Sequence, residues 1–171
     1  MSIVLIGYRG SGKSTIGKKL ADRLWQPFVD TDELIVRRAG MSIREIFEKK
    51  GEPYFRDLET EIVKEALLLE DHVVALGGGA ILREENRQAI KASNQRVIYL
   101  KCDPAVLAER IAADPSTAAS RPPLTPGRSS ADEVAQVLTE REPLYRQIMH
   151  AELDVTRLSP EDAVVYIVRL L

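Results

Sequence analysis

The segment from Gly7 to Ser14 constrains this chain more than any other, because it reads G-Y-R-G-S-G-K-S. The spacing G-x-x-x-x-G-K-S is typical of a loop whose backbone N–H groups surround phosphate oxygens. A continuous apolar run, Ser2–Ile6, precedes the loop, and apolar residues at helical spacing follow it within Ser14–Leu24. The sequence therefore predicts a buried parallel strand, a phosphate-binding loop and a helix, in that order, rather than a plain glycine-rich turn.

The side chains of this loop predict its ligands. In such a loop Lys13 brings a positive charge to the β- and γ-phosphates, and the Ser14 hydroxyl is a ligand for Mg²⁺. The loop residues expected to contact ATP are Gly10, Ser11, Gly12, Lys13, Ser14 and Thr15.

Length and composition narrow the class of protein. A chain of 171 residues, 44% of them hydrophobic and 29% charged, predicts one domain over residues 1–171. A formal net charge of −2 argues against a nucleic-acid partner. No apolar run approaches the ~20 residues of a membrane span, which argues against a membrane partner. The single cysteine, Cys102, fits a reducing compartment, so we expect a cytoplasmic protein.

Apolar runs alternate with helical patterns along the whole chain. This β-α-β alternation predicts an α/β fold with a parallel sheet that helices cover on both faces. The expected strands are Ile3–Ile6, Phe28–Asp30, Val73–Leu76, Val97–Leu100 and Leu153–Val155.

Four helix starts carry capping signals. Ser42–Glu45 and Ser130–Glu133 each have the spacing of a capping box. Asp103 and Ser159 each precede a proline, which predicts a capping side chain before the first helical position.

Residues 114–129 interrupt the pattern, with four prolines and no periodicity. A loop this long within a compact domain is often a functional lid, and a solvated connector is the alternative. Arg121 and Arg128 favour a lid over phosphates.

Two acids follow the second expected strand. Asp30 and Asp32 are separated by one residue, and residues i and i+2 of a strand point to the same side. Both carboxylates should then face the crevice at the carboxyl ends of the strands, where α/β sheets bind ligands. One acid can hold Mg²⁺ and the other can accept a proton from an acceptor hydroxyl. The alternative, an N-cap for a helix that begins near Glu33, needs only one of them.

A run of three glycines, Gly77–Gly79, follows the third expected strand and allows a tight turn whose backbone N–H groups approach an anion. Substrate contact is the favoured interpretation, and a plain turn is the alternative. Arg56 could bind a carboxylate through its guanidinium fork, although the local pattern alone favours a surface ion pair. Arg141, in Glu140–Arg146, is ambiguous in the same way.

Taken together, these motifs resemble those of the shikimate kinase family, within the nucleoside-monophosphate-kinase-like branch of P-loop proteins, over essentially the whole chain. The resemblance rests on the ordered set Gly7–Ser14, Asp30–Asp32, Phe55-Arg56, Gly77–Gly79, Arg121-Pro122 and Arg141–Tyr145. It implies transfer of the ATP γ-phosphate to the 3-hydroxyl of shikimate, and a five-stranded parallel sheet of order 2-3-1-4-5.

The resemblance also implies a role for each site residue. Asp32 is the expected base, and Asp30 is expected to hold Mg²⁺ together with Ser14. Arg121 is expected to reach from the lid over the phosphates, to which Lys13 also brings a positive charge. By the same resemblance Asp32 binds the shikimate hydroxyls, and Arg56 and Arg141 bind the shikimate carboxylate. The glycines Gly77, Gly78 and Gly79 line the same pocket. Arg110 and Arg157 match positions that flank the adenine.

Other functions remain to be separated from this one. A gluconate- or nucleotide-kinase-like enzyme would share the loop but would need a different acceptor pocket. A regulatory GTPase would need an Asn-Lys-x-Asp segment, and none is found. A non-catalytic nucleotide-binding module is disfavoured by the intact Lys13, Ser14, Asp30 and Asp32. We expect a monomer whose partners are ATP and shikimate.

Overall fold

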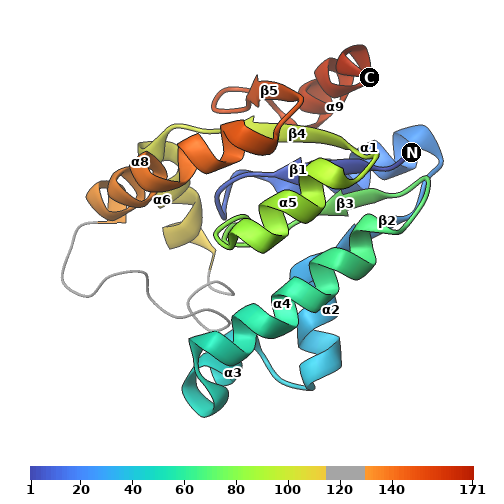
Figure 1. The fold of residues 1–171 in the computed structure, drawn as a ribbon. Helices are drawn as coiled ribbons and strands as arrows, with labels where there is room; N and C mark the ends of the chain where they lie inside the picture. The colour runs from blue at the N-terminus through green and yellow to red at the C-terminus, as the bar shows by residue number, and fades with distance from the viewer. Residues whose placement is uncertain (115–129) are drawn as a thin grey trace.

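The structure, a computed structural model, describes residues 1–114 and 130–171. Five parallel strands form one sheet in the order β2-β3-β1-β4-β5, which confirms the predicted α/β fold and strand order. The strands are β1 (Ile3–Ile6), β2 (Phe28–Asp30), β3 (Val73–Ala75), β4 (Arg96–Lys101) and β5 (Ala151–Asp154). Figure 1 shows the sheet with β2 and β5 at its edges.

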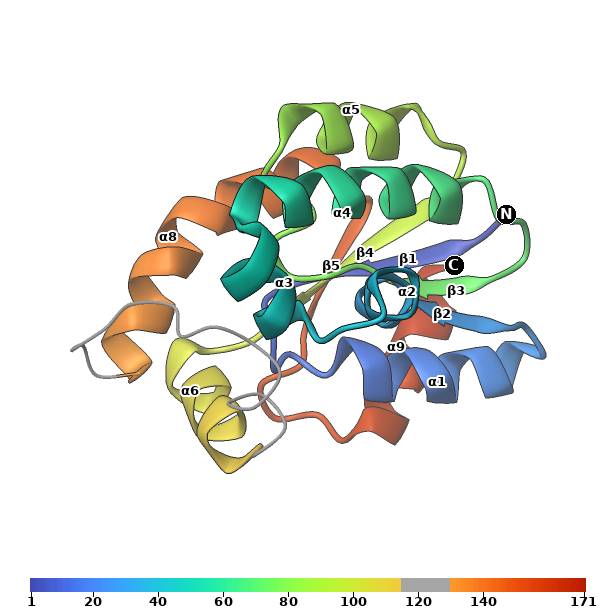
Figure 2. The same cartoon turned by 90° about the horizontal axis from the view of Figure 1, so that it is seen from below.

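Helices cover both faces of the sheet, as the alternating pattern predicts. Figure 2 shows α4 (Glu52–Leu67) and α5 (Glu84–Ala92) on one face, and α1 (Lys13–Leu24) and α9 (Pro160–Leu170) on the other. The remaining helices are α2 (Thr31–Ala39), α3 (Ile43–Lys50), α6 (Pro104–Ala113) and α8 (Ser130–Ile148). Every residue of β1 is buried, as expected for a central strand whose two faces are both covered.

The edge strand β5 differs from its prediction. The apolar run predicted Leu153–Val155, whereas the strand begins at Ala151 and ends at Asp154. Its residues alternate between half-buried and exposed, because an edge strand has one face open to water. Glu152 and Asp154 therefore belong to the strand even though they interrupt the apolar run.

A second, smaller hydrophobic cluster holds α2, α3 and the start of α4 together. These three helices contact one another and lie beside the sheet edge that β2 forms (Figure 1). The buried members of the cluster are Ile35, Ile43, Ile46, Phe55, Leu58 and Ile62. Asp32 on α2 and Arg56 on α4 are thus carried by the same packed unit.

Two of the four predicted capping signals are confirmed. Ser42 and Glu45 form the predicted capping box, and the Ser159 hydroxyl accepts from the N–H of Asp162 at 3.1 Å. Asp103 occupies the N-cap position of α6, but its side chain makes no capping hydrogen bond, so that prediction is wrong. Instead the Asp103 N–H donates to Thr156 at 3.0 Å, which ties this turn to the segment after β5. α8 begins at Ser130 itself, whose side chain lies outside the described part of the chain.

No helix within residues 1–114 and 130–171 is long and apolar enough to cross a membrane.

Candidate active site

The phosphate-binding loop connects β1 to α1 and ends at the N-cap of that helix. Gly12 is the N-cap residue and has φ 94°, a left-handed conformation that a residue with a side chain rarely adopts. The first N–H groups of α1 therefore point from the helix start into the loop, where the helix dipole also favours an anion.

Lys13 is held by the loop that contains it. Its ammonium donates to the carbonyl oxygens of Gly7 at 2.7 Å and Tyr8 at 2.9 Å, and only 9% of the residue is exposed. These bonds hold the charge inside the loop, close to the N-terminus of α1.

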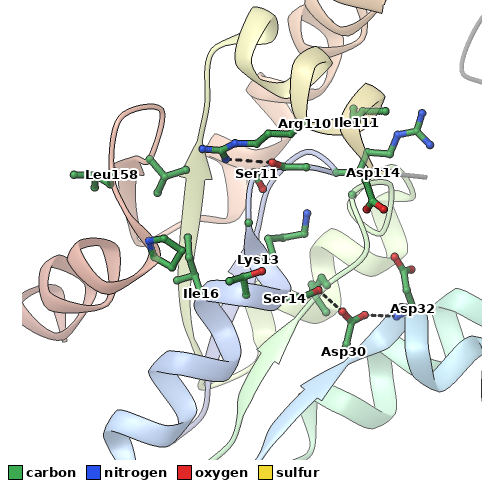
Figure 3. A pocket seen from close by; sticks show the side chains of 18 residues that line it. Ser11, Lys13, Ser14, Ile16, Asp30, Asp32, Arg110, Ile111, Asp114 and Leu158 are labelled. Carbon is green, nitrogen blue, oxygen red and sulfur yellow. Dashed lines mark hydrogen bonds between the residues drawn. The ribbon is translucent and has the colours of Figure 1, made fainter. Parts of the chain in front are cut away.

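A cavity of about 530 Å³ opens in front of this loop. All the loop residues predicted to contact ATP line it, together with Arg110 (Figure 3). The guanidinium of Arg110 donates to the Gly10 carbonyl at 3.2 Å, so α6 borders the loop directly. Arg157 is exposed and does not line the cavity. Sequence reasoning missed most of the apolar wall: Ile16, Leu76, Ile111, Val155, Leu158 and Pro160.

Asp30 and Ser14 meet at the floor of the cavity. The Ser14 hydroxyl donates to Oδ2 of Asp30 at 2.5 Å, as Figure 3 shows. The other oxygen, Oδ1, accepts from the N–H groups of Asp32 at 2.9 Å and Glu33 at 3.4 Å, which makes Asp30 the N-cap of α2. Asp30 thus caps a helix and also presents a carboxylate beside the loop.

Asp32 reaches the cavity for a different reason than predicted. It does not lie on a strand, because α2 begins at Thr31, earlier than the expected start near Glu33. The argument from strand alternation was therefore wrong, although both carboxylates line the same cavity. Asp32 lies in the first turn of a helix that starts at the carboxyl end of β2, and this turn directs its side chain.

The triple-glycine turn brings the predicted acceptor residues together. A Cβ at Gly77 would lie 2.5 Å from Oδ1 of Asp32, and one at Gly79 would lie 2.6 Å from Nη1 of Arg56. A Cβ at Gly78 would lie 3.7 Å from Nη1 of Arg141. The absence of side chains at Gly77 and Gly79 thus lets Asp32 of α2 and Arg56 of α4 approach this backbone segment, and Arg141 of α8 lies beside the same segment.

Arg56 is not the surface ion pair that the local pattern favoured. Only 15% of its side chain is exposed, and Nη1 donates to the Gly79 carbonyl at 3.2 Å and to Glu59 at 2.7 Å. Burial raises the pKa of the Glu59 carboxyl, and the nearby Arg56 guanidinium opposes that rise. Sequence reasoning did not single out Glu59; its i, i+3 spacing from Arg56 on α4 was the available signal.

Arg121 lies in residues 115–129, outside the described part of the chain, so the lid and its arginine stay predictions. Within the described residues, no group of three or more His, Cys, Asp and Glu side chains is arranged to hold a metal ion. Cys102 is buried, and burial raises the pKa of its thiol, which fits a structural residue.

Comparisons with known proteins agree with this geometry. The family described as shikimate kinase matches residues 9–171. This chain belongs to the shikimate kinase family. A shikimate kinase of Rhodopirellula baltica is 42% identical over 98% of this chain and 88% of its own length. A shikimate kinase 2 of Enterobacter sp. (strain 638) is 44% identical over 99% of this chain and 94% of its own length.

Solved structures give the same result. A shikimate kinase from Acinetobacter baumannii, in complex with shikimate, has a TM-score of 0.90 at 33% identity. The match covers 99% of this chain and 91% of that one. The enzyme from Aquifex aeolicus has a TM-score of 0.82 at 36% identity, over 99% and 95% of the two chains. The predicted family and its activity, an ATP-dependent shikimate kinase, are confirmed.

Proposed function

We propose that this chain transfers the γ-phosphoryl group of Mg·ATP to the 3-hydroxyl of shikimate, with Asp32 between the two substrates. One observation carries this assignment. Asp32 lines the cavity in front of the phosphate-binding loop and also contacts the glycine turn beside which Arg56 and Arg141 lie. A carboxylate at that junction can accept the proton of an acceptor hydroxyl as the hydroxyl oxygen attacks phosphorus.

The phosphates are bound by charge and by oriented backbone. Lys13 and the N-terminus of α1 both present positive charge to the cavity, and they are fixed before substrate binds. Fixed donors of this kind stabilise charge that develops on the transferred group without reorganising during the reaction. Arg121 would add a cation from the lid, and Arg110, on α6, would contact the nucleotide from the side of the cavity.

Ser14 and Asp30 fit a Mg²⁺ site. Both present oxygen atoms to the cavity and lie 2.5 Å apart, and Mg²⁺ is usually held by one or two protein oxygens with substrate phosphates and water. When bound, Mg²⁺ would neutralise phosphate charge. Asp30 can serve this site because its capping bonds occupy only one carboxylate oxygen, Oδ1.

The acceptor is bound through its carboxylate and held in line with the phosphates. Arg56 and Arg141 come from different helices and converge on the Gly77–Gly79 turn. Two guanidinium groups suit a planar carboxylate, and the turn offers backbone close to the ring of a small polyol. Their positions relative to Asp32 would set the 3-hydroxyl toward the cavity, which is the positioning that phosphoryl transfer needs.

A coupled assay of ADP release tests this assignment. With Mg·ATP, shikimate should give ADP release well above the background, whereas gluconate, a polyol acid of a different shape, should not. Asp32→Asn should lower kcat by about a hundredfold or more while ATP binding measured by calorimetry stays near wild type. If Asp32→Asn retained wild-type turnover of shikimate, the proposed base would be wrong. Equal rates with gluconate and shikimate would refute the acceptor pocket.

We further propose that the enzyme works as a cytoplasmic monomer of one domain. The buried free thiol of Cys102 suits a reducing compartment and so supports the cytoplasm. The monomer is supported because every proposed contact to a substrate comes from residues of one chain. Light scattering coupled to size exclusion should give the mass of one chain, 19.1 kDa. A dimer at assay concentration would contradict the proposal.

A further inference from the structure

Arg141 lies near two buried tyrosines that come from distant parts of the chain. Tyr8 belongs to the loop after β1, and Tyr145 lies on α8 four residues beyond Arg141, on the same face of that helix. Tyr8 is 1% exposed and Tyr145 is fully buried. Arg141 has a proposed role in binding the acceptor's carboxylate, whereas neither tyrosine has a role in the proposed phosphoryl transfer.

Tyr8 contacts Arg141 through its ring. The guanidinium carbon of Arg141 lies 5.5 Å from the centre of the Tyr8 ring, within the range of a cation–π interaction. The Tyr8 hydroxyl is buried and has no hydrogen-bond partner among the described residues. Burial of an unpaired hydroxyl is unfavourable, so the hydroxyl does not explain this position. The aromatic face against Arg141 does.

Tyr145 contacts the backbone beside which Arg141 lies. Its hydroxyl donates to the Gly78 carbonyl at 2.7 Å, and its ring stacks on Tyr99 with centroids 4.8 Å apart. A Cβ at Gly78 would lie 3.7 Å from Nη1 of Arg141, so the same residue touches both side chains. Burial raises the pKa of Tyr145, and the Arg141 charge opposes that rise, which agrees with their closeness.

We propose that Tyr8 and Tyr145 are positioning residues for Arg141. Together the two tyrosines hold the Arg141 guanidinium at the glycine turn, where it would bind the carboxylate of the acceptor. This inference rests on the proposed role of Arg141 in acceptor binding. An arginine side chain has many rotamers, and fixing them on binding weakens affinity. The Tyr8 ring and the Tyr145–Gly78 hydrogen bond restrict those rotamers before the acceptor arrives. The phosphate-binding loop and the glycine turn thereby take part in acceptor affinity through one arginine.

Both tyrosines also belong to the main hydrophobic cluster, so the test must separate positioning from packing. Tyr8→Leu removes the ring face, and Tyr8→Phe restores it without the hydroxyl. Tyr145→Phe removes only the oxygen that bonds Gly78. Tyr166→Leu is the matched control, since Tyr166 faces Arg169 at 5.9 Å on the exposed side of α9, away from the site.

The expected results concern shikimate rather than ATP. Tyr8→Leu and Tyr145→Phe should each raise the KM for shikimate by about three- to tenfold, with the KM for ATP unchanged. Tyr8→Phe should recover most of the affinity that Tyr8→Leu loses. Tyr166→Leu should leave both KM values at wild type. Thermal melting of each variant shows whether it is folded, and Tyr145→Phe decides the question if Tyr8→Leu does not fold.

A double-mutant cycle gives the deciding readout. If the tyrosines act through Arg141, adding Tyr8→Leu or Tyr145→Phe to Arg141→Ala should not lower kcat/KM for shikimate further. Additive losses would overturn the proposal in favour of general packing, as would a wild-type shikimate KM in both tyrosine variants. If Arg141→Ala itself kept the wild-type KM, the proposed role of Arg141 would fail first, and the two failures would be distinguishable.

Discussion

The carboxylate of Glu59 accepts a 2.7 Å hydrogen bond from the Arg56 guanidinium at a position where its side chain is only 2% exposed. The two residues are one turn apart on α4, and Arg56 also donates to the Gly79 carbonyl. A buried acid is unfavourable unless it is paired, so Glu59 is retained in the interior by its arginine. In return its hydrogen bond holds Nη1 of the guanidinium beside the glycine turn.

Replacement of Glu59 should therefore impair acceptor binding more than nucleotide binding. In Glu59→Gln the neutral amide gives Arg56 a weaker partner, and we expect the KM for shikimate to rise by about tenfold. Glu52 is a matched control, because it lies 3.5 Å from Nε of the same arginine but its side chain is 60% exposed. Glu52→Gln should change the KM by less than about twofold. Equal effects of the two changes would refute a special role for the buried acid.

Glu59 also predicts a pH dependence of acceptor affinity. Burial raises the pKa of this carboxyl from its ordinary value, Arg56 and Arg141 lower it, and Asp32 raises it, with burial dominant. Glu59 should thus become neutral at a higher pH than an ordinary glutamate, and the KM for shikimate should rise as pH falls toward about 5.

The same shift sets the sign of a stability change. Because the folded-state pKa is raised, the contribution of Glu59 to stability is full at acid pH and is lost as pH rises through that pKa. Wild type should therefore gain stability relative to Glu59→Gln as pH falls. Melting temperatures and KM values measured for both proteins across this range test the two signs together. A Glu59→Gln enzyme with the wild-type pH profile would assign the KM change to another group, including the substrate carboxylate.

Two substitutions of Asp30 separate its structural and chemical roles. Asparagine is as good an N-cap as aspartate but carries no charge, whereas alanine loses both properties. Asp30→Asn should keep stability near wild type and raise the Mg²⁺ concentration needed for half-maximal turnover, because the metal loses a charged ligand. Asp30→Ala should in addition lose about 1 kcal/mol of unfolding free energy. Denaturant melts and Mg²⁺ titrations of turnover measure the two effects; full turnover at low Mg²⁺ in Asp30→Asn would remove Asp30 from the metal site.

The elements that could be predicted from the sequence are those whose signal is local. The buried strand β1 is a continuous apolar run in the sequence, and the capping-box spacing of Ser42 and Glu45 predicts the start of α3. The strand β5 was misplaced because its edge position lets polar residues alternate with apolar ones. Asp103 has the identity of a cap, but no local rule indicates that Thr156, far along the chain, is bonded to its backbone.

For the candidate active site, the sequence predicted which residues take part, but it did not predict where the fold places the side chains outside the phosphate-binding loop. The phosphate-binding loop fixes its own geometry through Gly12 and Lys13, so its role follows from spacing. Asp32 was assigned to the right cavity by a wrong argument, since its direction depends on where α2 begins. Glu59 is 2% exposed in the folded chain, and its i, i+3 spacing from Arg56 indicates the ion pair but not its burial.

The glycine turn makes a prediction in which function changes and stability does not. A Cβ at Gly79 would lie 2.6 Å from Nη1 of Arg56, at the far end of a flexible side chain that can move aside. Gly79→Ala should therefore fold normally yet raise the KM for shikimate by about tenfold or more. Gly17→Ala is the opposite case, because its Cβ would lie 2.4 Å from the Phe28 ring. That variant should lose about 1–3 kcal/mol of stability from overpacking, with the KM for shikimate unchanged. A destabilised Gly79→Ala with normal affinity would contradict this division.

The two arginines expected near adenine should differ in their effect on ATP. Arg110 lines the cavity and bonds the Gly10 carbonyl at 3.2 Å, whereas Arg157 is exposed and does not line it. Arg110→Ala should raise the KM for ATP by about five- to twentyfold, because it removes a cation from the cavity wall and loosens the contact between α6 and the loop. Arg157→Ala should raise it by less than about threefold. Neither change should alter the KM for shikimate, and steady-state kinetics with each substrate varied measures both. A larger ATP effect for Arg157 would mean that the segment after β5 moves onto the nucleotide when it binds.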